Sequence, residues 1–305
     1  MAVPPRLDIL GFGAVAVDDL LFVDEYPAAD QKVQVRHRLR QCGGLTGTAL
    51  VAASRLGARC GYVGLLGEDE LSREVAACLA GEAIDLAHCV RRPDARPAHS
   101  TIIVDQRRGT RTIFASLDGA IGPDPRLPEA DLIRSASVLL VDHHGLEGTL
   151  RAVRIGRDGG VGVVADLERD PGPPFDEVLG LVDHLVLSER FARQLTGRDD
   201  PAGAAAALWR PDRHAVVVTC GAAGCWYLGP EYEDQARHCP ALPVEVVDTT
   251  GCGDVFHGAY AAALARGLDL RSRVEYASGA AALKATRRGG QAGIPDRATL
   301  EAFLA

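Results

Sequence analysis

One stretch of this sequence decides its fold: Asp248-Thr249-Thr250-Gly251-Cys252-Gly253-Asp254-Val255-Phe256-His257-Gly258-Ala259. A β-branched run with one glutamate, Val-Glu-Val-Val, precedes it at 244–247, and an almost uninterrupted run of small and apolar residues fills 255–265. Because glycine permits backbone angles that other residues avoid, the pattern predicts a strand, a tight turn and the start of a helix. The first N–H groups of a helix have no partner within it and carry a partial positive charge. The expected anion-binding amides are those of Gly251, Cys252 and Gly253.

Asp254 is an acid in the first turn of this predicted helix, next to the anion-binding amides. A carboxylate there can accept a proton from a substrate hydroxyl while the amides stabilise the charge on a transferring phosphoryl group. It can also be an acid that the helix dipole favours, in a turn where glycines serve steric needs alone. The spacing by itself leaves both interpretations open.

Residues 248–256 resemble the C-terminal signature of the ribokinase, or PfkB-type, family of sugar kinases, Asp-Thr-x-Gly-Ala-Gly-Asp-x-Phe. Cys252 replaces the usual alanine, a change between small residues that keeps the backbone amide. The resemblance implies that Asp254 is the catalytic base and that the amides of 251–253 form an anion hole. It also implies ATP and Mg²⁺ as cofactors and allows a monovalent cation such as K⁺.

The composition is typical of a globular protein of the cytoplasm. The 305 residues are 47% hydrophobic and carry a formal net charge of −8, which argues against nucleic acid or an acidic membrane surface as a partner. No stretch has the pattern of a signal peptide or the length of a membrane span. The eight cysteines include no CxxC pair, so reduced thiols and a cytoplasmic location are expected.

Strand-like and helix-like segments alternate after residue 136. The predicted strands are 138–142, 161–165 with Asp166 at its end, and 184–187, and the predicted helices are 146–158 and 189–195. This alternation at short spacing predicts an α/β fold with a doubly wound, mostly parallel central sheet and helices on both faces. The resemblance implies the same ribokinase-like fold, as a single domain over 1–305.

Two other regions have the alternation of half-exposed strands. They lie at 20–23 with 32–41, and in a predicted hairpin of 100–104 with 111–116. The resemblance implies that about 19–41 and 98–118 form a small β-sheet lid over the sugar, and that the lid joins two copies into a homodimer. Three arginines of the hairpin are either a solvated tip or contacts for an acidic substrate: Arg107, Arg108 and Arg111.

Residues 7–17 are expected to form the first buried strand, which Asp18 and Asp19 follow. Ligands of open α/β sheets gather at the carboxyl ends of strands, so Asp18 is either a substrate contact or an exposed turn acid. By the resemblance, Asp18 binds sugar hydroxyls. Ala16 stands where ribokinases carry an asparagine, so the resemblance does not specify ribose.

Gly43 and Gly44 precede a helix-like run at 50–56. A Gly-Gly pair lets the backbone approach a ligand closely, or makes a flexible turn in which Thr46 or Thr48 caps the helix. Together with 51–57, the pair resembles the N-terminal signature of the same family. The resemblance implies that Gly43, Gly44 and Thr48 bind the substrate, with Thr48 in the place of a sugar-binding asparagine.

The strand-like run 215–219 continues into the pattern Thr-x-Gly-x-x-Gly. This pattern resembles the family's nucleotide segment and fits a hairpin with turn glycines equally well. Residues 188–191, Ser-Glu-Arg-Phe, occupy the place of the family's Asn-x-x-Glu, which is tied to magnesium and phosphate. Glu189 is the candidate metal contact, through water, because Mg²⁺ keeps several waters. The expected nucleotide-binding residues are Ser188, Thr219, Gly221, Gly224 and Gly289.

These features predict the ATP-dependent phosphorylation of a hydroxymethyl group of a sugar or sugar derivative. The alternatives are a nucleoside kinase on the same fold and a non-catalytic sensor of sugar or nucleotide. A dinucleotide oxidoreductase is disfavoured because no G-x-G-x-x-G follows the first strand. Within the family, 43–57 and 247–295 look most similar to bacterial sulfofructose kinases. Lys32 matches a basic residue of that group, whereas Ala115 and His144 replace an expected Asn and Arg.

Overall fold

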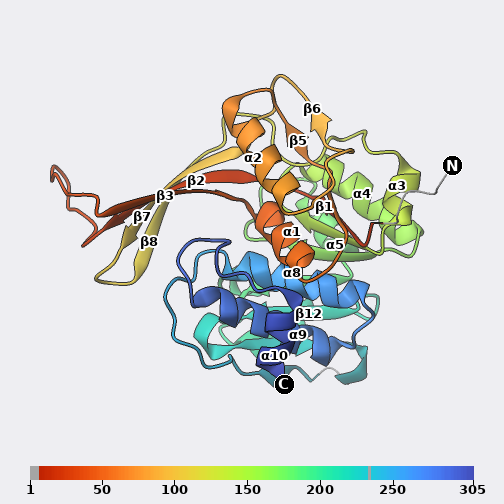
Figure 1. Cartoon of the computed structure of the whole chain (residues 1–305). Helices are drawn as coiled ribbons and strands as arrows, with labels where there is room; N and C mark the ends of the chain where they lie inside the picture. Colours follow the sequence, from red (N-terminus) through yellow and green to blue (C-terminus); the bar gives the residue numbers. More distant parts are fainter. Residues whose placement is uncertain (1–6, 233–234) are drawn as a thin grey trace.

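An eight-stranded sheet forms the centre of the molecule, whose computed structural model describes residues 7–232 and 235–305 (Figure 1). Its strand order is β14-β13-β12-β11-β10-β9-β1-β4. Neighbouring strands from β12 to β4 are parallel, and β13 is antiparallel to both β12 and β14. The bounds are β1 (Ile9–Phe12), β4 (Cys60–Tyr62), β9 (Val138–Asp142), β10 (Gly162–Asp166), β11 (His184–Ser188), β12 (Ala215–Thr219), β13 (Cys225–Leu228) and β14 (Arg237–Cys239).

Helices cover both faces of this sheet because successive residues of each buried strand point to opposite sides. In β9, Val138 and Leu140 belong to one hydrophobic core, and Leu139 and Val141 belong to the other. None of the helices in the described ranges is both long and apolar enough to cross a membrane. The first core is covered by α1 (Leu45–Arg55), α2 (Glu70–Gly81), α8 (Cys252–Ala265), α9 (Leu270–Ala285) and α10 (Arg297–Leu304), and the second by α3 (Ala130–Ser135), α4 (Leu146–Asp158), α5 (Phe175–Leu181), α6 (Glu189–Thr196) and α7 (Pro201–Leu208).

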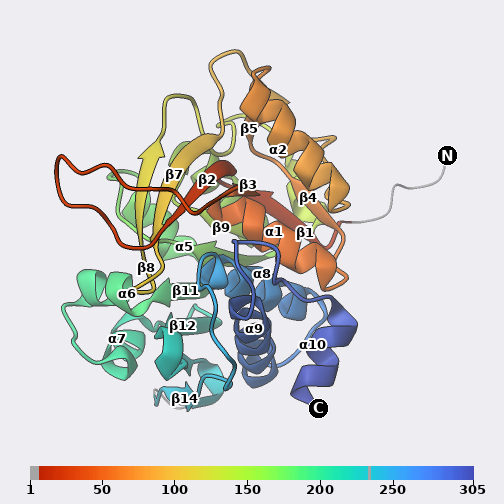
Figure 2. The ribbon, with the colours of Figure 1, turned by 60° about the vertical axis from the view of Figure 1, so that its left-hand side comes forward.

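A second sheet of four strands, which we call the lid sheet, projects from the body as an arm (Figures 1 and 2). Its order is β3-β2-β7-β8, with β2 parallel to β7 and the other pairs antiparallel. A small apolar cluster of Leu20, Phe22 and Ile102 lies on one of its faces. The bounds are β2 (Ala16–Val23), β3 (His37–Gly43), β7 (Ala98–Asp105) and β8 (Thr110–Ser116), and a separate short pair is formed by β5 (Leu65–Leu66) and β6 (Val90–Arg91).

The doubly wound α/β fold with a mostly parallel sheet and a small lid is confirmed. The predicted strand 138–142 and helix 146–158 coincide with β9 and α4. Both segments have unambiguous patterns, a continuous apolar run for the strand and an amphipathic repeat for the helix. Local pattern is therefore sufficient for these two elements.

The prediction of one strand over 7–17 was wrong. The chain leaves the central sheet after Phe12 and enters the lid sheet as β2 at Ala16. The crossing is fixed from a distant segment, since Asp142 Oδ2 accepts a hydrogen bond of 2.7 Å from Ala14 N. A Cβ on Gly13 would lie 2.1 Å from the same oxygen, so glycine is required there. Asp18 consequently lies within a lid strand and not at the end of a central strand.

The predicted strand at 244–247 was also wrong. The segment is irregular, and Val246 and Val247 are 60% and 50% exposed. Pro240 and Pro243 lack the N–H that would extend the sheet beyond β14. Val247 N instead donates to Ala285 O at 2.8 Å, so the segment lies against the end of α9.

The helix predicted from residue 50 begins earlier, at Leu45. Gly44 has φ 88° at the N-cap, and a Cβ there would lie 2.6 Å from the Cα of Val15. Thr46 and Thr48 are therefore helical residues and do not cap the helix. The close approach of Gly44 to Val15 brings the start of α1 against the crossing between the two sheets.

Candidate active site

The turn at 248–251 is folded by Asp248. Its Oδ1 accepts a hydrogen bond from Thr250 N, and its Oδ2 accepts one from Gly289 N, both at 2.8 Å. Gly251 has φ 77°, and a Cβ there would lie 2.8 Å from Gly290 O. Only glycine meets both conditions without strain, so the chain reverses here and α8 starts at Cys252.

The start of α8 presents backbone N–H groups to solvent. Cys252 N donates to Thr249 O at 3.2 Å. Gly251 N and Gly253 N donate to no protein acceptor within the described ranges. Gly253 is exposed, and nothing lies within 4 Å of where its Cβ would be. The amides of Gly251 and Gly253 are thus the most available donors for an anion at this helix end.

Asp254 follows these amides and faces a group of other carboxylates. Burial raises the pKa of Asp254 well above its ordinary value, and repulsion from Asp166, Glu168, Asp18 and Asp142 raises it further. Asp18 and Asp254, which the sequence placed in separate motifs, are thus close enough to influence each other. A carboxylate with a raised pKa is a stronger base once it has lost its proton.

Asp166, at the end of β10, is a further member of this group. It is 5% exposed, and its Oδ2 lies 3.2 Å from His257 Nδ1 without accepting a hydrogen bond within the described structure. His257 Nδ1 and Nε2 instead lie 2.8 and 2.9 Å from the carbonyl oxygens of Gly253 and Val186. Burial, then Glu168 and Asp142, raises the pKa of Asp166. An unsatisfied buried carboxylate beside an anion site fits a divalent cation with its waters.

The described residues contain no group of three His, Cys, Asp or Glu side chains arranged to hold a metal ion directly. A cation at Asp166 would therefore take most of its ligands from water and substrate oxygens, as Mg²⁺ does. Glu189 is exposed in the first turn of α6, after Ser188, whose Oγ accepts from Phe191 N at 3.3 Å. Asp166 was missed as a metal contact although it ends a predicted strand, the same signal that singled out Asp18.

Asp142 connects the segments around the site. It is fully buried, and its Oδ2 accepts from Ala14 N and, at 2.9 Å, from Thr46 Oγ1. Its Oδ1 accepts from His144 N at 2.8 Å. Although burial alone would raise it, the hydrogen bonds and the nearby histidines lower the pKa of Asp142. Asp142 therefore acts as a charged anchor for the crossing, for α1 and for the loop after β9.

Three of the predicted substrate residues lie together at the base of the lid sheet. Asp18 in β2 pairs with Gln41 in β3, and a Cβ on Gly43 would lie 2.2 Å from Asp18 Oδ2. Gly44 follows as the N-cap of α1. Burial raises the pKa of Asp18 to about 6, against a hydrogen bond from Ser100 that lowers it. The missing side chain at Gly43 leaves the space that this carboxylate occupies.

Thr48 lies one turn further into α1. It is 2% exposed, and its Oγ1 accepts a hydrogen bond of 3.4 Å from Gln291 Nε2. This hydroxyl is therefore already engaged by another side chain. Gln291 is a buried polar residue beside the predicted substrate positions, and no local pattern in the sequence distinguishes it.

The predicted nucleotide residues form two neighbouring groups. Ser188 and Thr219 are partners at the carboxyl ends of β11 and β12, and the turn after Thr219 has positive φ at Gly221 and Gly224. Gly289 is bonded to Asp248, which joins it to the anion-binding turn. The exposed side chains of Val246 and Val247 directly precede the turn at 248–251 in the chain.

The lid sheet touches the anion-binding turn. Arg111 Nη1 in β8 donates to Thr249 Oγ1 at 3.3 Å, and Gly290 N donates to Gln41 Oε1 at 3.0 Å. Arg107 and Arg108 instead pair with Glu25, at 2.7 and 2.8 Å. The arginines therefore differ: Arg111 contacts the turn at 248–251, and the other two form ion pairs at the solvated tip.

Lys284 places a buried positive charge beneath the turn. The side chain is fully buried near the end of α9, and its Nζ donates to Asp248 O at 2.8 Å. Burial lowers the pKa of Lys284, against the nearby Cys252 and Asp248. No pattern in the sequence distinguishes this residue, because a single lysine near a helix end has no motif of its own.

Comparisons with known proteins agree with this fold. A fructokinase of Klebsiella pneumoniae is 31% identical over 291 residues, covering 88% of this chain and 93% of its own length. A solved structure from Agrobacterium tumefaciens, described as a candidate ribokinase, has a TM-score of 0.91 at 31% identity, covering 98% of this chain and 97% of its own. An Arabidopsis thaliana ribokinase solved with ribose and ATP shares the fold, with a TM-score of 0.84 at 22% identity over 98% of this chain and 99% of its own. The family model of the pfkB family carbohydrate kinases matches residues 7–297. The chain belongs to the PfkB family of carbohydrate kinases.

Proposed function

We propose that this protein transfers the terminal phosphoryl group of ATP to a hydroxymethyl group of a sugar or sugar derivative. The observation that carries the proposal is the position of Asp254, directly after the available amides of Gly251 and Gly253 and within electrostatic reach of Asp18. A base and an anion site at one helix start are what in-line phosphoryl transfer to a hydroxyl requires.

In this mechanism Asp18 accepts hydrogen bonds from acceptor hydroxyls and orients the reacting one toward Asp254. Asp254 takes the hydroxyl proton as the oxygen attacks phosphorus, and the Gly251 and Gly253 amides stabilise the charge on the transferring group. Gly43 and Gly44 let the acceptor approach the backbone. Thr48 holds Gln291 in place beside the acceptor, a more indirect role than the resemblance implied.

Asp166 and Glu168 are the residues that we expect to hold Mg²⁺ and its waters, with Glu189 as a more distant contact through water. The ion would neutralise charge on the phosphate oxygens when it is bound. The unsatisfied Oδ2 of Asp166 supports this assignment. We expect five residues to contact the nucleotide: Ser188, Thr219, Gly221, Gly224 and Gly289.

We also propose that a monovalent cation such as K⁺ contributes only weakly to this activity. Lys284 already supplies a positive charge to the carbonyl of Asp248, so we expect the activity to depend only weakly on K⁺. The measurement is turnover in potassium chloride against tetramethylammonium chloride at equal ionic strength. A large loss without K⁺ would show that Lys284 does not provide the charge that the turn needs.

Release of ADP over a panel of sugars and nucleosides tests the function. The panel includes hexoses, ketoses, pentoses, a sulfonated ketose and nucleosides, since the acceptor residues depart from the ribokinase pattern. Lys32 and Ala115 are both exposed, and His144 is bonded to Asp142, so a sulfonate has no arginine to bind at that position. Binding of ATP without turnover of any acceptor would support a sensor, and preference for a nucleoside would support the nucleoside kinase.

Replacement of Asp254 by asparagine tests the mechanism. Since the amide cannot take the proton, we expect kcat to fall by about 10²- to 10⁴-fold with little change in ATP affinity measured by calorimetry. Asp131→Asn, at a fully exposed side chain in α3, is the matched control and should leave both quantities unchanged. Full turnover in Asp254→Asn would eliminate Asp254 as the base.

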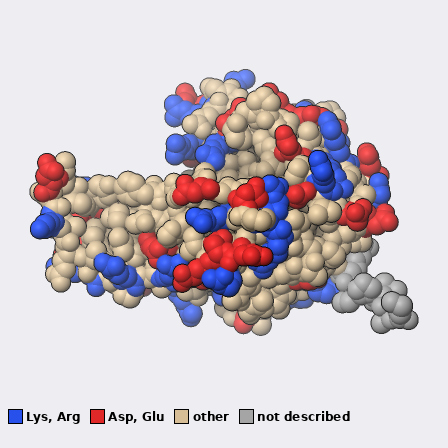
Figure 3. All heavy atoms as spheres, turned by 90° about the horizontal axis from the view of Figure 1, so that it is seen from above, with Lys and Arg blue, Asp and Glu red and all other residues tan. Residues whose placement is uncertain are grey.

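We also propose that two copies associate through the lid sheet. Its edge strand β8 exposes Ile113 and Phe114, which are 52% and 54% exposed, and Leu117 follows with 43%. Seen from above, uncharged atoms cover much of the arm (Figure 3). An edge strand with exposed apolar side chains is suited to a partner of the same kind. We expect this enzyme to act in the cytoplasm, where thiols are kept reduced except in transient redox reactions.

A further inference from the structure

Two cysteines face each other across the antiparallel edge of the central sheet. Cys225 in β13 and Cys239 in β14 are direct register partners, and both are free thiols. The Cα atoms of such partners lie about 4.5–5.5 Å apart. This separation falls within the range of about 4.4–6.8 Å that a disulfide spans. The backbone therefore already has the spacing for a bond between them.

Both sulfur atoms point toward α9. Ser278 Oγ in that helix lies 4.0 Å from Cys225 Sγ and 3.8 Å from Cys239 Sγ. Two thiols that share one hydroxyl neighbour lie on the same face of the strand pair, which is the second requirement for a bond. Cys225 is 1% exposed and Cys239 is 8% exposed, so the two differ in access.

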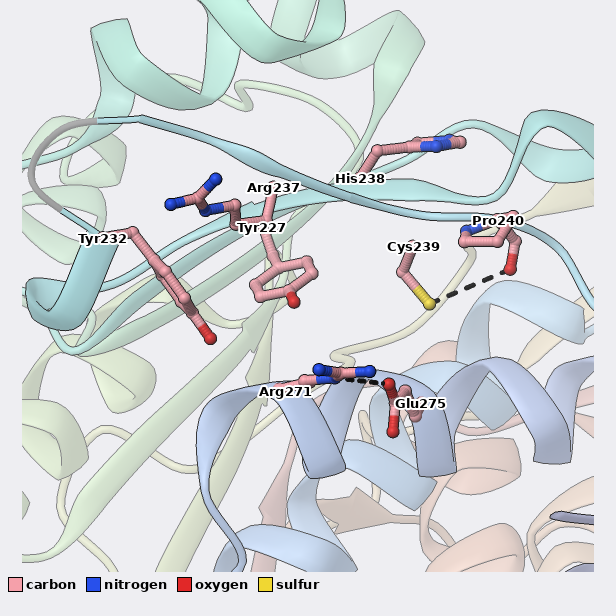
Figure 4. A pocket seen from close by; sticks show the side chains of 8 residues that line it. All are labelled: Tyr227, Tyr232, Arg237, His238, Cys239, Pro240, Arg271 and Glu275. Atoms are coloured by element: carbon pink, nitrogen blue, oxygen red, sulfur yellow. Dashed lines mark hydrogen bonds and ion pairs between the residues drawn. The ribbon is translucent and has the colours of Figure 1, made fainter. Parts of the chain in front are cut away.

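A cavity of about 390 Å³ gives that access to Cys239. It is lined by Tyr227, Tyr232, Cys239, Arg271 and Glu275 among others. Figure 4 shows the Cys239 side chain pointing from β14 toward α9, with Arg271 and Glu275 across the cavity. A small reagent that enters the cavity can reach Cys239, whereas Cys225 does not line it.

The two thiols also differ in pKa, and the more accessible one has the lower pKa. The hydrogen bond from Cys225 is the largest cause that lowers the pKa of Cys239 to about 6, and the Ser278 hydroxyl assists it. The same interaction raises the pKa of Cys225. At neutral pH Cys239 is therefore the better nucleophile, and Cys225 is a protonated partner beside it.

We propose that Cys239 and Cys225 are a redox-active pair, in which Cys239 reacts with a low-molecular-weight disulfide and Cys225 resolves the product. The Cys239 thiolate attacks one sulfur of the small disulfide, breaks its S–S bond and releases one thiolate, which takes up a proton. Cys225 then loses its proton to solvent, attacks Cys239 Sγ and releases the second small thiol. Two protein thiols are oxidised to one disulfide, and the small disulfide is reduced to two thiols.

The pair adjoins the turn after β12. Gly224, the last glycine of that turn, directly precedes Cys225, and a Cβ on it would lie 2.1 Å from Cys239 O. A bond between the two cysteines would fix the spacing of β13 and β14 next to this turn. If the turn binds ATP, which rests on the proposed function, oxidation should raise the KM for ATP several-fold.

The experiment treats the full-length protein with oxidised glutathione and measures its intact mass and its peptide map after alkylation. We expect loss of two hydrogen atoms and a Cys225–Cys239 cross-linked peptide, reversed by dithiothreitol. Cys225→Ser should instead retain one glutathione on Cys239, and Cys239→Ser should form neither product at this site. Cys60→Ser, at another buried cysteine, is the control and should behave as the wild type.

Three results would overturn the proposal: no disulfide, a disulfide between two other cysteines in place of this pair, or glutathione that stays on Cys239 in the wild type. These mass measurements need no kinase activity, so they remain decisive if no sugar is phosphorylated. If the disulfide forms and the KM for ATP is unchanged in an active enzyme, the thiol chemistry stands and its coupling to the nucleotide turn is rejected.

Discussion

Asp18 shows how one residue can serve binding at a cost in stability. Its carboxyl group is partly buried beside Ser100, and this burial raises its pKa from 3.8 to about 6. A raised pKa means that the folded protein binds this proton more tightly than the unfolded chain does. Stability therefore decreases as the pH rises from about 4 to 6, and the full cost of the buried charge remains above that range.

The first prediction concerns the stability of Asp18→Asn. Because a shift of about two pKa units corresponds to roughly 3 kcal/mol, we expect this variant to be more stable than the wild type by about 1–3 kcal/mol near pH 8. Near pH 4 the difference should largely vanish, since the wild-type carboxyl is then protonated. Urea unfolding at the two pH values measures it, and an equal difference at both would contradict the assignment.

The second prediction is the effect of the same group on activity. As the pH falls through about 6, Asp18 gains a proton and loses capacity to accept hydrogen bonds from a sugar. The value of kcat/KM for the acceptor should fall in this range, because that quantity reports groups of the free enzyme. In Asp18→Asn it should be low throughout, with a flatter profile. A wild-type profile that the substitution leaves unaltered would remove Asp18 from the acceptor site.

The third prediction concerns the buried charge of Lys284. Methionine has a similar length and no charge, so Lys284→Met loses the hydrogen bond to Asp248 O but keeps the packing. Since the exchange removes the buried charge but leaves Asp248 O without its donor, we expect a destabilisation of about 1–3 kcal/mol. The kcat should fall at least about tenfold, equivalent to roughly 1.4 kcal/mol of lost charge stabilisation near the anion site. Arg126→Met, at an exposed position, is the control.

At the scale of elements, the crossing from β1 to β2 positions the acceptor residues. The carboxylate of Asp142 holds Ala14 N and Thr46 Oγ1, and so joins the two sheets to α1. It needs the space that Gly13 leaves. The sequence contained both ends of this contact but no local pattern that joins them, because residues 14 and 142 are far apart in the chain.

Gly13→Ala tests this junction. The added Cβ would lie 2.1 Å from Asp142 Oδ2, so we expect a destabilisation of about 2–4 kcal/mol, within the range for strain in a buried network. Gly81→Ala at the end of α2 is the matched control, as no atom lies within 4 Å of its added Cβ, and it should be neutral or slightly stabilising. Thermal unfolding measures both variants, and a similar stability for the two would contradict the role of Gly13.

At the scale of the whole molecule, the lid sheet is the element that the proposed dimer would cover. A four-stranded sheet with one small cluster of Leu20, Phe22 and Ile102 buries little apolar area by itself. Its edge strand β8 leaves Ile113 and Phe114 exposed. Association of two arms would cover these side chains and would also restrict Arg111 near the anion-binding turn.

Phe114→Arg should disrupt this association. A charge in the covered face cannot be solvated, so light scattering after size exclusion should show a shift from dimer to monomer. Leu127→Arg, at an exposed apolar residue outside the lid sheet that is 40% exposed, should leave the mass unchanged. A wild-type protein that is already monomeric at micromolar concentration would reject the lid dimer.

Much of the fold could be predicted because its signals are local. The runs at 138–142 and 215–219 are apolar up to their last residues, Asp142 and Thr219, as is typical of strands buried on both faces, and they became β9 and β12. The glycine turn before Asp254 was also predictable, since turn and helix-start preferences depend on adjacent residues. The strand predictions at 7–17 and 244–247 were wrong for the opposite reason. Both segments have local β propensity, but strand pairing depends on contacts with distant parts of the chain.

The sequence by itself determined the alternation of strands and helices, the turn at 248–254 and the acids and glycines that could bind a sugar and a phosphate. Only the tertiary structure decided that Asp254 faces Asp166 and Asp18, that Lys284 lies beneath Asp248 and that Cys225 faces Cys239. The physical reason is the separation along the chain over which each interaction acts. Propensities and turn chemistry act between neighbours in the chain, whereas the charges and thiols of this site meet through sheet register and through one buried carboxylate that directs the chain from one sheet to the other.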